Sequence, residues 1–241
     1  MRIGTWNVNS ARARRDRITD LLARHDIDVL ALQETKLKEF PEVDGYEVAH
    51  VGYNQWNGVA ILSRVGLDDV QTSFLGQPDY EGKHEGRAVS AVCGGKRIWS
   101  LYVPNGRDVD HPHYDYKLRF LYNFARYAAP EADLAMGDFN VVPRPQDVYD
   151  ESQLITHVTE PERAAFEYLT DVLPIVSPDE YTYWDYQARR FDRNQGMRID
   201  FQLSREPAIA GFVDRKERAG KSSDHAPLIA DFAVADFDSV R

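Results

Sequence analysis

AMGDFNVVP, residues 135–143, joins the end of an apolar run to two polar side chains spaced two residues apart. Side chains alternate across a strand, so a strand through this stretch points Asp138 and Asn140 to one face and Phe139 to the other. Pro143 then stops any continuation of the strand. Asp and Asn also commonly form turns, so the stretch alone is compatible with either a turn or a functional site.

Short apolar runs of strand length recur along the chain and predict a protein rich in β-strands. Apolar residues at helical spacing also predict helices, the last of them started by the capping-box pair Thr159 and Glu162. Gly94-Gly95 is a hairpin-turn signal between two predicted strands. The predicted strands occupy residues 3–8, 27–34, 58–64, 88–95, 97–103, 133–139, 197–204 and 226–234. The predicted helices occupy residues 15–26, 116–129 and 159–172.

The length and composition favour one large folded unit. The chain has 241 residues, 43% of them hydrophobic, and no linker, low-complexity segment or clear repeat divides it. We therefore expect a single domain, 1–241, of the α+β class, with two packed sheets and outer helices.

Three observations favour a soluble protein in a reducing, cytoplasmic setting. The chain has no run of 18 apolar residues that would predict a membrane span. Its start, MRIGTWNVNS, lacks the apolar region of a signal peptide. The single cysteine, Cys93, lies in a predicted strand and is expected to be a small buried hydrophobic residue.

The charge distribution gives two opposing indications. A formal net charge of −10 argues against a protein that coats nucleic acid non-specifically, because such proteins carry a basic excess. Arginines nevertheless cluster at residues 11–17 and 188–198. Such runs can be solvated surface or a local basic face for a charged ligand.

Polar side chains that suit a core poorly lie at or near the ends of several predicted strands. Loops at strand ends on a rigid scaffold often carry binding and catalytic residues. Each residue also has a purely structural interpretation, as a turn residue, a helix cap, a packing residue or a hydrogen-bonded core histidine. The set consists of Asn7, Asn9, Glu34, Tyr102, Asp138, Asn140, Asp200, Asp224 and His225.

The chemistry of this set points to a hard cation. Its carboxylate and amide oxygens suit Mg²⁺ or Mn²⁺, and no cysteine cluster or HExxH motif supports zinc. His225 beside Asp200 would form a carboxylate–imidazole pair that fixes a tautomer or holds a proton. The oxygen ligands would come from Asn7, Glu34, Asp138, Asn140 and Asp224.

Six motifs together resemble the exonuclease III family, the bacterial branch of the apurinic/apyrimidinic endonucleases, over Met1 to about Phe232. Some of them are shared with phosphoinositide phosphatases, sphingomyelinases and deadenylases of the wider endonuclease/exonuclease/phosphatase superfamily. WDY at 184–186, QGMRIDF at 195–201 and Tyr102 are narrower and favour exonuclease III. The motifs are TWNVNSARAR (5–14), LALQETK (30–36), YVPNGR (102–107), MGDFNVVP (136–143), YTYWDYQARRFDRNQGMRIDFQLS (181–204) and SSDHAPL (222–228).

The resemblance implies a deoxyribonuclease-like fold, a four-layer α/β/β/α sandwich of two mixed sheets flanked by helices. It implies a Mg²⁺-dependent DNA repair nuclease, with Mn²⁺ as an alternative metal, that cuts 5′ to abasic sites. It also implies removal of nucleotides or blocking groups from 3′ ends. The expected partner is double-stranded DNA with abasic sites or damaged 3′ ends. The protein is expected to be a monomer and not to bind membranes.

The resemblance also implies residue roles. Glu34 would be the principal metal ligand, and Asp138 would also orient or deprotonate the attacking water. His225, oriented by Asp200, would contact the scissile phosphate, and Tyr102 would lie against it as donor or phenolate. The remaining metal-site positions would be Asn7, Asn140, Asp224 and, beside them, His225. The weaker DNA-contact candidates are Asn9, Arg107 and Lys117, and the abasic-sugar pocket would be lined by Tyr183, Trp184 and Met197.

Two features depart from the family pattern and bear on DNA affinity. The stretch 75–85 is shorter than in many relatives, and the chain is acidic overall. Two other functions therefore stay open: a phosphatase or phosphodiesterase of the same superfamily with a non-DNA substrate, and a catalytically silent nucleic-acid-binding relative. The complete set of polar residues argues against the silent relative.

Overall fold

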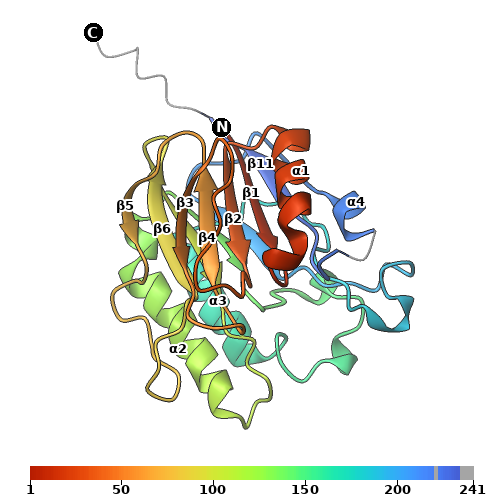
Figure 1. The fold of residues 1–241 in the computed structure, drawn as a ribbon. Helices are drawn as coiled ribbons and strands as arrows, with labels where there is room; N and C mark the ends of the chain where they lie inside the picture. Colours follow the sequence, from red (N-terminus) through yellow and green to blue (C-terminus); the bar gives the residue numbers. More distant parts are fainter. Residues whose placement is uncertain (220–221, 234–241) are drawn as a thin grey trace.

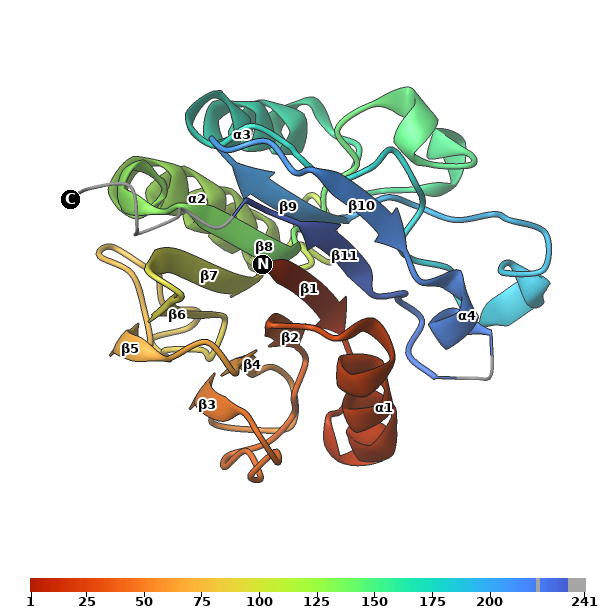
Figure 2. The same ribbon diagram turned by 90° about the horizontal axis from the view of Figure 1, so that it is seen from above.

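The computed structural model describes residues 1–219 and 222–233, which form four layers (Figure 1). Two β-sheets lie face to face in the middle. Helix α1 (Arg15–His25) covers the outer face of one sheet, and α2 (Pro112–Tyr127) and α3 (Glu160–Val172) cover the other, as the view from above shows (Figure 2). The predicted four-layer α/β/β/α sandwich is confirmed.

Both sheets are mixed, and each has a parallel pair at or near its centre. The first sheet pairs β1 with β2 in parallel, and the second pairs β7 with β8 in parallel. The first sheet has the order β10 (Ala210–Val213), β11 (Leu228–Asp231), β1 (Arg2–Asn7), β2 (Val29–Gln33), β4 (Val59–Ser63) and β3 (Glu47–Val51). The second has the order β5 (Asp68–Gln71), β6 (Ala88–Cys93), β7 (Lys96–Tyr102), β8 (Leu134–Asp138) and β9 (Asp200–Ser204).

Burial on both faces explains why the central strands are almost continuously apolar. Between the sheets, Ile3 and Ile61 of the first pack against Ile98 and Met136 of the second. Cys93 belongs to this cluster and is buried, as predicted. Removal of this apolar surface from water is the main stabilisation of the two-sheet arrangement.

The outer faces bury the apolar stripes of the helices. Ile18, Leu21 and Leu22 of α1 pack on the first sheet. Phe120 of α2 and Phe166 of α3 belong to the core that covers the second sheet. No helix within 1–219 and 222–233 is long and apolar enough to cross a membrane.

Helix starts follow local capping chemistry. At α3, the side chain of Thr159 accepts from the Glu162 backbone and Glu162 reaches back to Thr159, which confirms the predicted capping box. Helix α2 begins at Pro112, four residues before its predicted start. The reason is that the His111 side chain caps its amino end and Pro112 suits the first helical position.

The sequence pattern missed elements with little buried surface. Strand β5 is exposed at all positions, β10 is exposed at three, and neither shows a strong apolar alternation. Strand β3 and the short helix α4 (Arg215–Arg218) were also not predicted. The last two predicted strands are shorter than expected, and Val234, where 226–234 ended, lies outside the described residues.

Candidate active site

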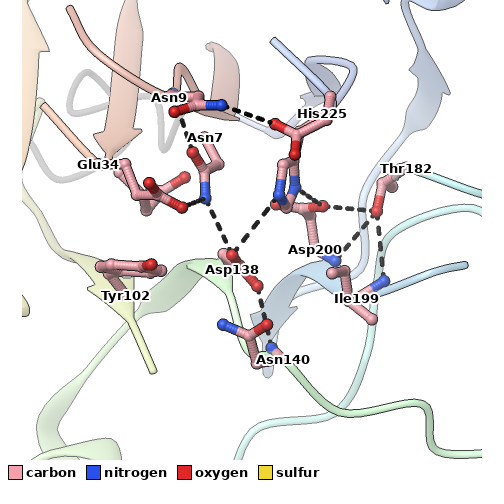
Figure 3. A network of polar contacts seen from close by, with 12 residues as sticks. Asn7, Asn9, Glu34, Tyr102, Asp138, Asn140, Thr182, Ile199, Asp200 and His225 are labelled. Atoms are coloured by element: carbon pink, nitrogen blue, oxygen red, sulfur yellow. Dashed lines mark hydrogen bonds and ion pairs between the residues drawn. The ribbon is translucent and has the colours of Figure 1, made fainter. Parts of the chain in front are cut away.

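The site lies where the carboxyl ends of the two parallel pairs meet (Figure 3). Asn7 ends β1, Glu34 follows β2, Tyr102 ends β7 and Asp138 ends β8. The Asn7 amide joins the two sheets, because its Nδ2 lies 2.9 Å from both Glu34 Oε1 and Asp138 Oδ2. Strand direction therefore brings residues far apart in sequence to one edge of the sandwich.

Asp138 is at the centre of the network and is almost fully buried. Its Oδ2 accepts from Asn7, and its Oδ1 accepts from the backbone N–H of Asn140 at 3.0 Å. Burial raises the pKa of the Asp138 carboxyl above its usual value, while the adjacent His225 works in the opposite direction. A carboxylate whose pKa is raised toward neutrality has the basicity needed to accept a proton from water.

Asn140 does not share a strand face with Asp138, so that prediction was wrong. Strand β8 ends at Asp138, and Asn140 has a left-handed backbone with φ 51°. Its Nδ2 donates to the Val103 carbonyl at 3.0 Å. The turn alternative therefore accounts for the local backbone, and this turn aims the Asn140 backbone N–H at Asp138.

His157 is a residue of this site that sequence reasoning missed. Its Nε2 lies 3.0 Å from Asn140 Oδ1, and its Nδ1 lies 2.9 Å from Thr156 Oγ1. Burial holds the pKa of His157 well below its usual value, so the ring is neutral and its Nε2–H can donate to Asn140. Nothing in the local sequence ITHV indicates this long-range contact.

His225 and Asp200 form a buried pair. His225 Nδ1 lies 2.8 Å from Asp200 Oδ2, which also accepts from the Thr182 hydroxyl at 2.6 Å. Nε2 of His225 lies 3.8 Å from Asp138 Oδ2. Although burial disfavours a charged ring, the Asp200 and Asp138 carboxylates raise the pKa of His225 above its usual value. The ring is thus held as a cationic donor beside the Asp138 carboxylate.

A second group of polar side chains lies around Glu34. Lys36 Nζ lies 3.1 Å from Glu34 Oε2 and 2.6 Å from Asn9 Oδ1. Asn9 Nδ2 lies 3.3 Å from Asp224 Oδ1. Burial opposes the charged form of Glu34, but the Asn7 hydrogen bond and the Lys36 charge lower its pKa below the usual value. Glu34 is therefore an anion that already has a positive charge next to it.

Tyr102 faces this cluster as a neutral phenol. Burial, reinforced by the Glu34 charge, raises the pKa of Tyr102 well above its usual value. The Arg87 guanidinium lies 4.8 Å from the centre of the Tyr102 ring and fixes the ring in place. Of the two roles expected for this residue, the structure favours hydrogen-bond donor over phenolate.

The donor set fits a hard divalent cation. Asp138, Asp200 and His225 offer one ligand atom each within 4.8 Å of one another, which is consistent with a metal site. However, the Asp200–His225 hydrogen bond already uses atoms of both residues. The partly buried anion Glu34, joined to Asp138 through Asn7 and with Asp224 beyond Asn9, is the better match to Mg²⁺ chemistry.

Two predicted substrate contacts are wrong, because the side chains are inaccessible. Lys117 is 0% exposed, and its ammonium pairs with Glu162 and donates to the Asn140 carbonyl at 2.6 Å. It therefore supports the turn at Asn140 from below. Trp184 is also 0% exposed and packs against Phe191 with ring centres 5.1 Å apart. It supports the loop that carries the Tyr183 backbone without lining a sugar pocket.

The other predicted contacts lie at the surface around the cluster. Tyr183 packs against His225 with ring centres 5.0 Å apart, and with Met197 it lines a cavity of about 220 Å³. Tyr149 and Arg190 also line this cavity. Arg107 is exposed and lines a separate hollow that contains Tyr102.

Known proteins match this chain over nearly its whole length. Residues 4–225 match the Endonuclease/Exonuclease/phosphatase family. Exodeoxyribonuclease III of Haemophilus influenzae is 27% identical over 267 residues, or 96% of this chain and 100% of that protein. The structure of an AP endonuclease from Archaeoglobus fulgidus aligns with TM-score 0.87 and 32% identity, over 97% of this chain and 100% of that one. The 3′ phosphatase NExo from Neisseria, solved with a product DNA hairpin, aligns with TM-score 0.89 and 32% identity, over 97% of this chain and 99% of that one.

Proposed function

The chain belongs to the endonuclease/exonuclease/phosphatase family, as a phosphodiester hydrolase of its exonuclease III/AP endonuclease branch, and we propose that it repairs damaged DNA. In this proposal it hydrolyses the phosphodiester 5′ to an abasic site. It also removes nucleotides or blocking groups from 3′ ends. Its cofactor is Mg²⁺, which Mn²⁺ can replace.

The observation that carries the proposal is the Asn7–Asp138–His225–Asp200 network at the meeting edge of the two sheets. Asp138 is held by two N–H donors in the orientation needed to position a water and accept its proton. His225 is held by Asp200 with its Nε2 directed toward Asp138. The two groups thus supply a base and a cationic donor 3.8 Å apart.

Hydrolysis of a phosphodiester requires both groups at once. Asp138 would orient the attacking water in line with the leaving oxygen, while His225 and the Tyr102 hydroxyl would donate to the non-bridging oxygens, where negative charge develops. Mg²⁺ held by Glu34, with Asn7, Asp224 and Asp138, would add Lewis-acid stabilisation of the same charge. The raised pKa of His225 suits this role, because a charged imidazole is a stronger donor than a neutral one.

The cavity beside His225 supports an abasic or terminal sugar as the adjacent group. Tyr183 and Met197 supply apolar walls, and Tyr149, Gln153 and Arg190 supply a polar edge. The cavity of about 220 Å³ is small. A deoxyribose without its base would bury its carbon face here while its phosphate lies at Asp138 and His225.

The test is Mg²⁺-dependent cleavage of three labelled duplexes: one intact, one with a single abasic site, and one ending in a 3′-phosphate. We expect cleavage 5′ to the abasic site and release of the 3′-phosphate, with the intact interior bonds left uncut. Hydrolysis of a lipid or sugar phosphate without cleavage of any of these duplexes would favour the non-DNA phosphatase instead.

Binding of DNA should be strongly salt-dependent, because the first arginine run contacts the same residue as Tyr186, which lies just before the second run. Arg14 and the Tyr186 hydroxyl both donate to the Ser222 carbonyl, at 3.3 and 2.5 Å. Arg198 is buried against Asp179 and is not available. Each phosphate neutralised should lower log affinity by about 0.9 per log unit of salt.

We expect the affinity of the Asp138→Asn protein for an abasic duplex to fall steeply when log affinity is plotted against log salt concentration. Changing Arg189, Arg190 and Arg193 to Ala in that protein should make this slope shallower by about 2–3. A triple variant of Lys96, Arg97 and Arg126 is the matched control. Lys96 and Arg97 are the first two residues of β7, whereas Tyr102 is its last, so they lie at the end of the strand that is far from the site. A flat slope in the parent, or equal losses in both triple variants, would contradict DNA binding by the arginine face.

A further inference from the structure

We propose that Trp56 is a stacking platform for a nucleobase of the DNA held at the catalytic cluster; this rests on the function proposed above and adds a subsite to it. The side chain lies in the loop between β3 and β4 and is 72% exposed. The chain's other three tryptophans, Trp6, Trp99 and Trp184, lie in the described residues and are buried. A large exposed indole is costly to leave in water and is a common contact in binding sites.

One hollow beside the indole connects it to Tyr102. This hollow, of about 410 Å³, is lined by Trp56, Glu85, Arg87, Tyr102, Asn105, Arg107 and His113. Arg87 is 5% exposed, and its Nε donates to Glu85 Oε2 at 2.5 Å, so this carboxylate is already neutralised. Arg107 is exposed and adds a second positive charge to the lining. The hollow is therefore suited to a phosphate next to the scissile one.

The same indole also lines a second hollow. It has a volume of about 510 Å³ and is lined by Ser10, Arg12, Lys36, Gln55 and Trp56. The Lys36 ammonium lies 3.1 Å from Glu34 and is balanced by that carboxylate, so the exposed Arg12 supplies the positive charge of this hollow. Lys38 and Tyr53 extend this surface, together with one carboxylate, Glu39. The indole thus lines two hollows that contain cationic side chains, and each hollow also contains a residue in or next to the catalytic cluster, Tyr102 or Lys36.

The base of the loop is fixed to the segments that carry these cations. The Lys36 backbone N–H donates to the Asn57 carbonyl at 3.0 Å, and the Gly58 N–H donates to the Gly86 carbonyl at 2.9 Å. Gly86 directly precedes Arg87. The position of Trp56 relative to the cations and the catalytic cluster is therefore built into the backbone.

These observations identify the ligand by its chemistry. Alternating phosphates and flat aromatic groups are the features of a nucleic-acid strand, and cations interleaved with an exposed aromatic ring match them. Phosphates would lie in the two hollows, and a base of the same or the opposing strand would lie on the indole. The overall net charge of −10 makes this local positive surface necessary for DNA to approach.

The test uses Trp56 as its own reporter, because the other three indoles are buried. In the Asp138→Asn background, we titrate an abasic duplex and follow tryptophan emission, and we measure affinity separately by anisotropy of labelled DNA. We expect strong quenching with Trp56 present and little with Trp56→Phe. Trp56→Ala should weaken binding roughly 5- to 100-fold, the range found for a lost base–aromatic stack.

Two comparisons separate base stacking from general hydrophobic contact with the DNA. Trp56→Phe should retain most of the affinity and Trp56→Leu should not, because only the aromatic ring offers a π-face. Ile209→Ala, at an equally exposed position on the edge near β10, is the matched control and should leave affinity unchanged.

Equal affinities for Trp56→Leu and Trp56→Phe, or no loss in Trp56→Ala, would overturn the proposal. If the wild-type protein cleaves none of the three duplexes, the proposed repair function fails instead, so the two failures are distinguishable.

Discussion

Replacement of Asp138 by Asn is expected to lower turnover on an abasic duplex roughly 10²–10⁴-fold, while DNA binding changes far less. Asn keeps the shape of the side chain, but its single amide oxygen can accept from only one of the two donors, Asn7 Nδ2 and the Asn140 backbone N–H, and it cannot accept a proton from water. It also removes the carboxylate that faces His225 at 3.8 Å. The loss should therefore appear in kcat, with a smaller change in KM.

The measurement is single-turnover cleavage with saturating protein, together with a binding titration of the same variant. Asp214→Asn is the matched control, because Asp214 is also buried, ion-paired with Arg24 and hydrogen-bonded to His25, away from the site. That variant should lose stability and keep its turnover when folded. Turnover of Asp138→Asn above about a tenth of wild type would exclude Asp138 as the main proton acceptor.

The sequence was most informative about the residues at strand ends. Asn7, Glu34, Tyr102 and Asp138 each follow an apolar run, and parallel strands end at the same edge of a sheet, so their convergence could be predicted. The central strands were predicted for the same reason, because burial on both faces leaves a continuous apolar signature.

What the sequence could not predict depends on contacts between distant segments. The turn at Asn140 is held by Val103, His157 and Lys117, which come from three separate parts of the chain. The Lys117–Glu162 pair is fully buried, although a lysine on a helix surface is normally solvated. The sequence around Lys117 therefore suggested a DNA contact, whereas tertiary packing buries this lysine in an ion pair with Glu162.

The exposed edge strands β5 and β10 were not predicted for a different reason. Strands β5 and β10 bury little apolar surface and are specified by backbone pairing with β6 and β11. Such pairing leaves little trace in residue type, since any non-proline residue can supply the hydrogen bonds.

Removal of the divalent cation, or of its principal ligand, should abolish cleavage and leave the fold intact. The cation would supply several kcal/mol of charge stabilisation, so excess EDTA or Glu34→Gln should lower turnover roughly 10²–10⁴-fold. The midpoint temperature of thermal unfolding should barely change. Glu34 lies beyond the end of β2, and none of the proposed metal-binding residues belongs to the hydrophobic core between the sheets.

Measuring activity against Mg²⁺ concentration distinguishes a metal site that has been weakened from one that has been lost. If Glu34 is a ligand, Glu34→Gln should need far more Mg²⁺ for half-maximal activity than the wild type, whereas Glu47→Gln, on the exposed edge of β3, should not. Lys36→Met should lower the Mg²⁺ concentration needed for half-maximal activity. The Lys36 ammonium lies 3.1 Å from the same carboxylate and competes with an incoming cation. Unchanged cleavage in excess chelator would refute the metal mechanism, and an unchanged Mg²⁺ requirement in Glu34→Gln would move the site to the Asp138, Asp200 and His225 cluster.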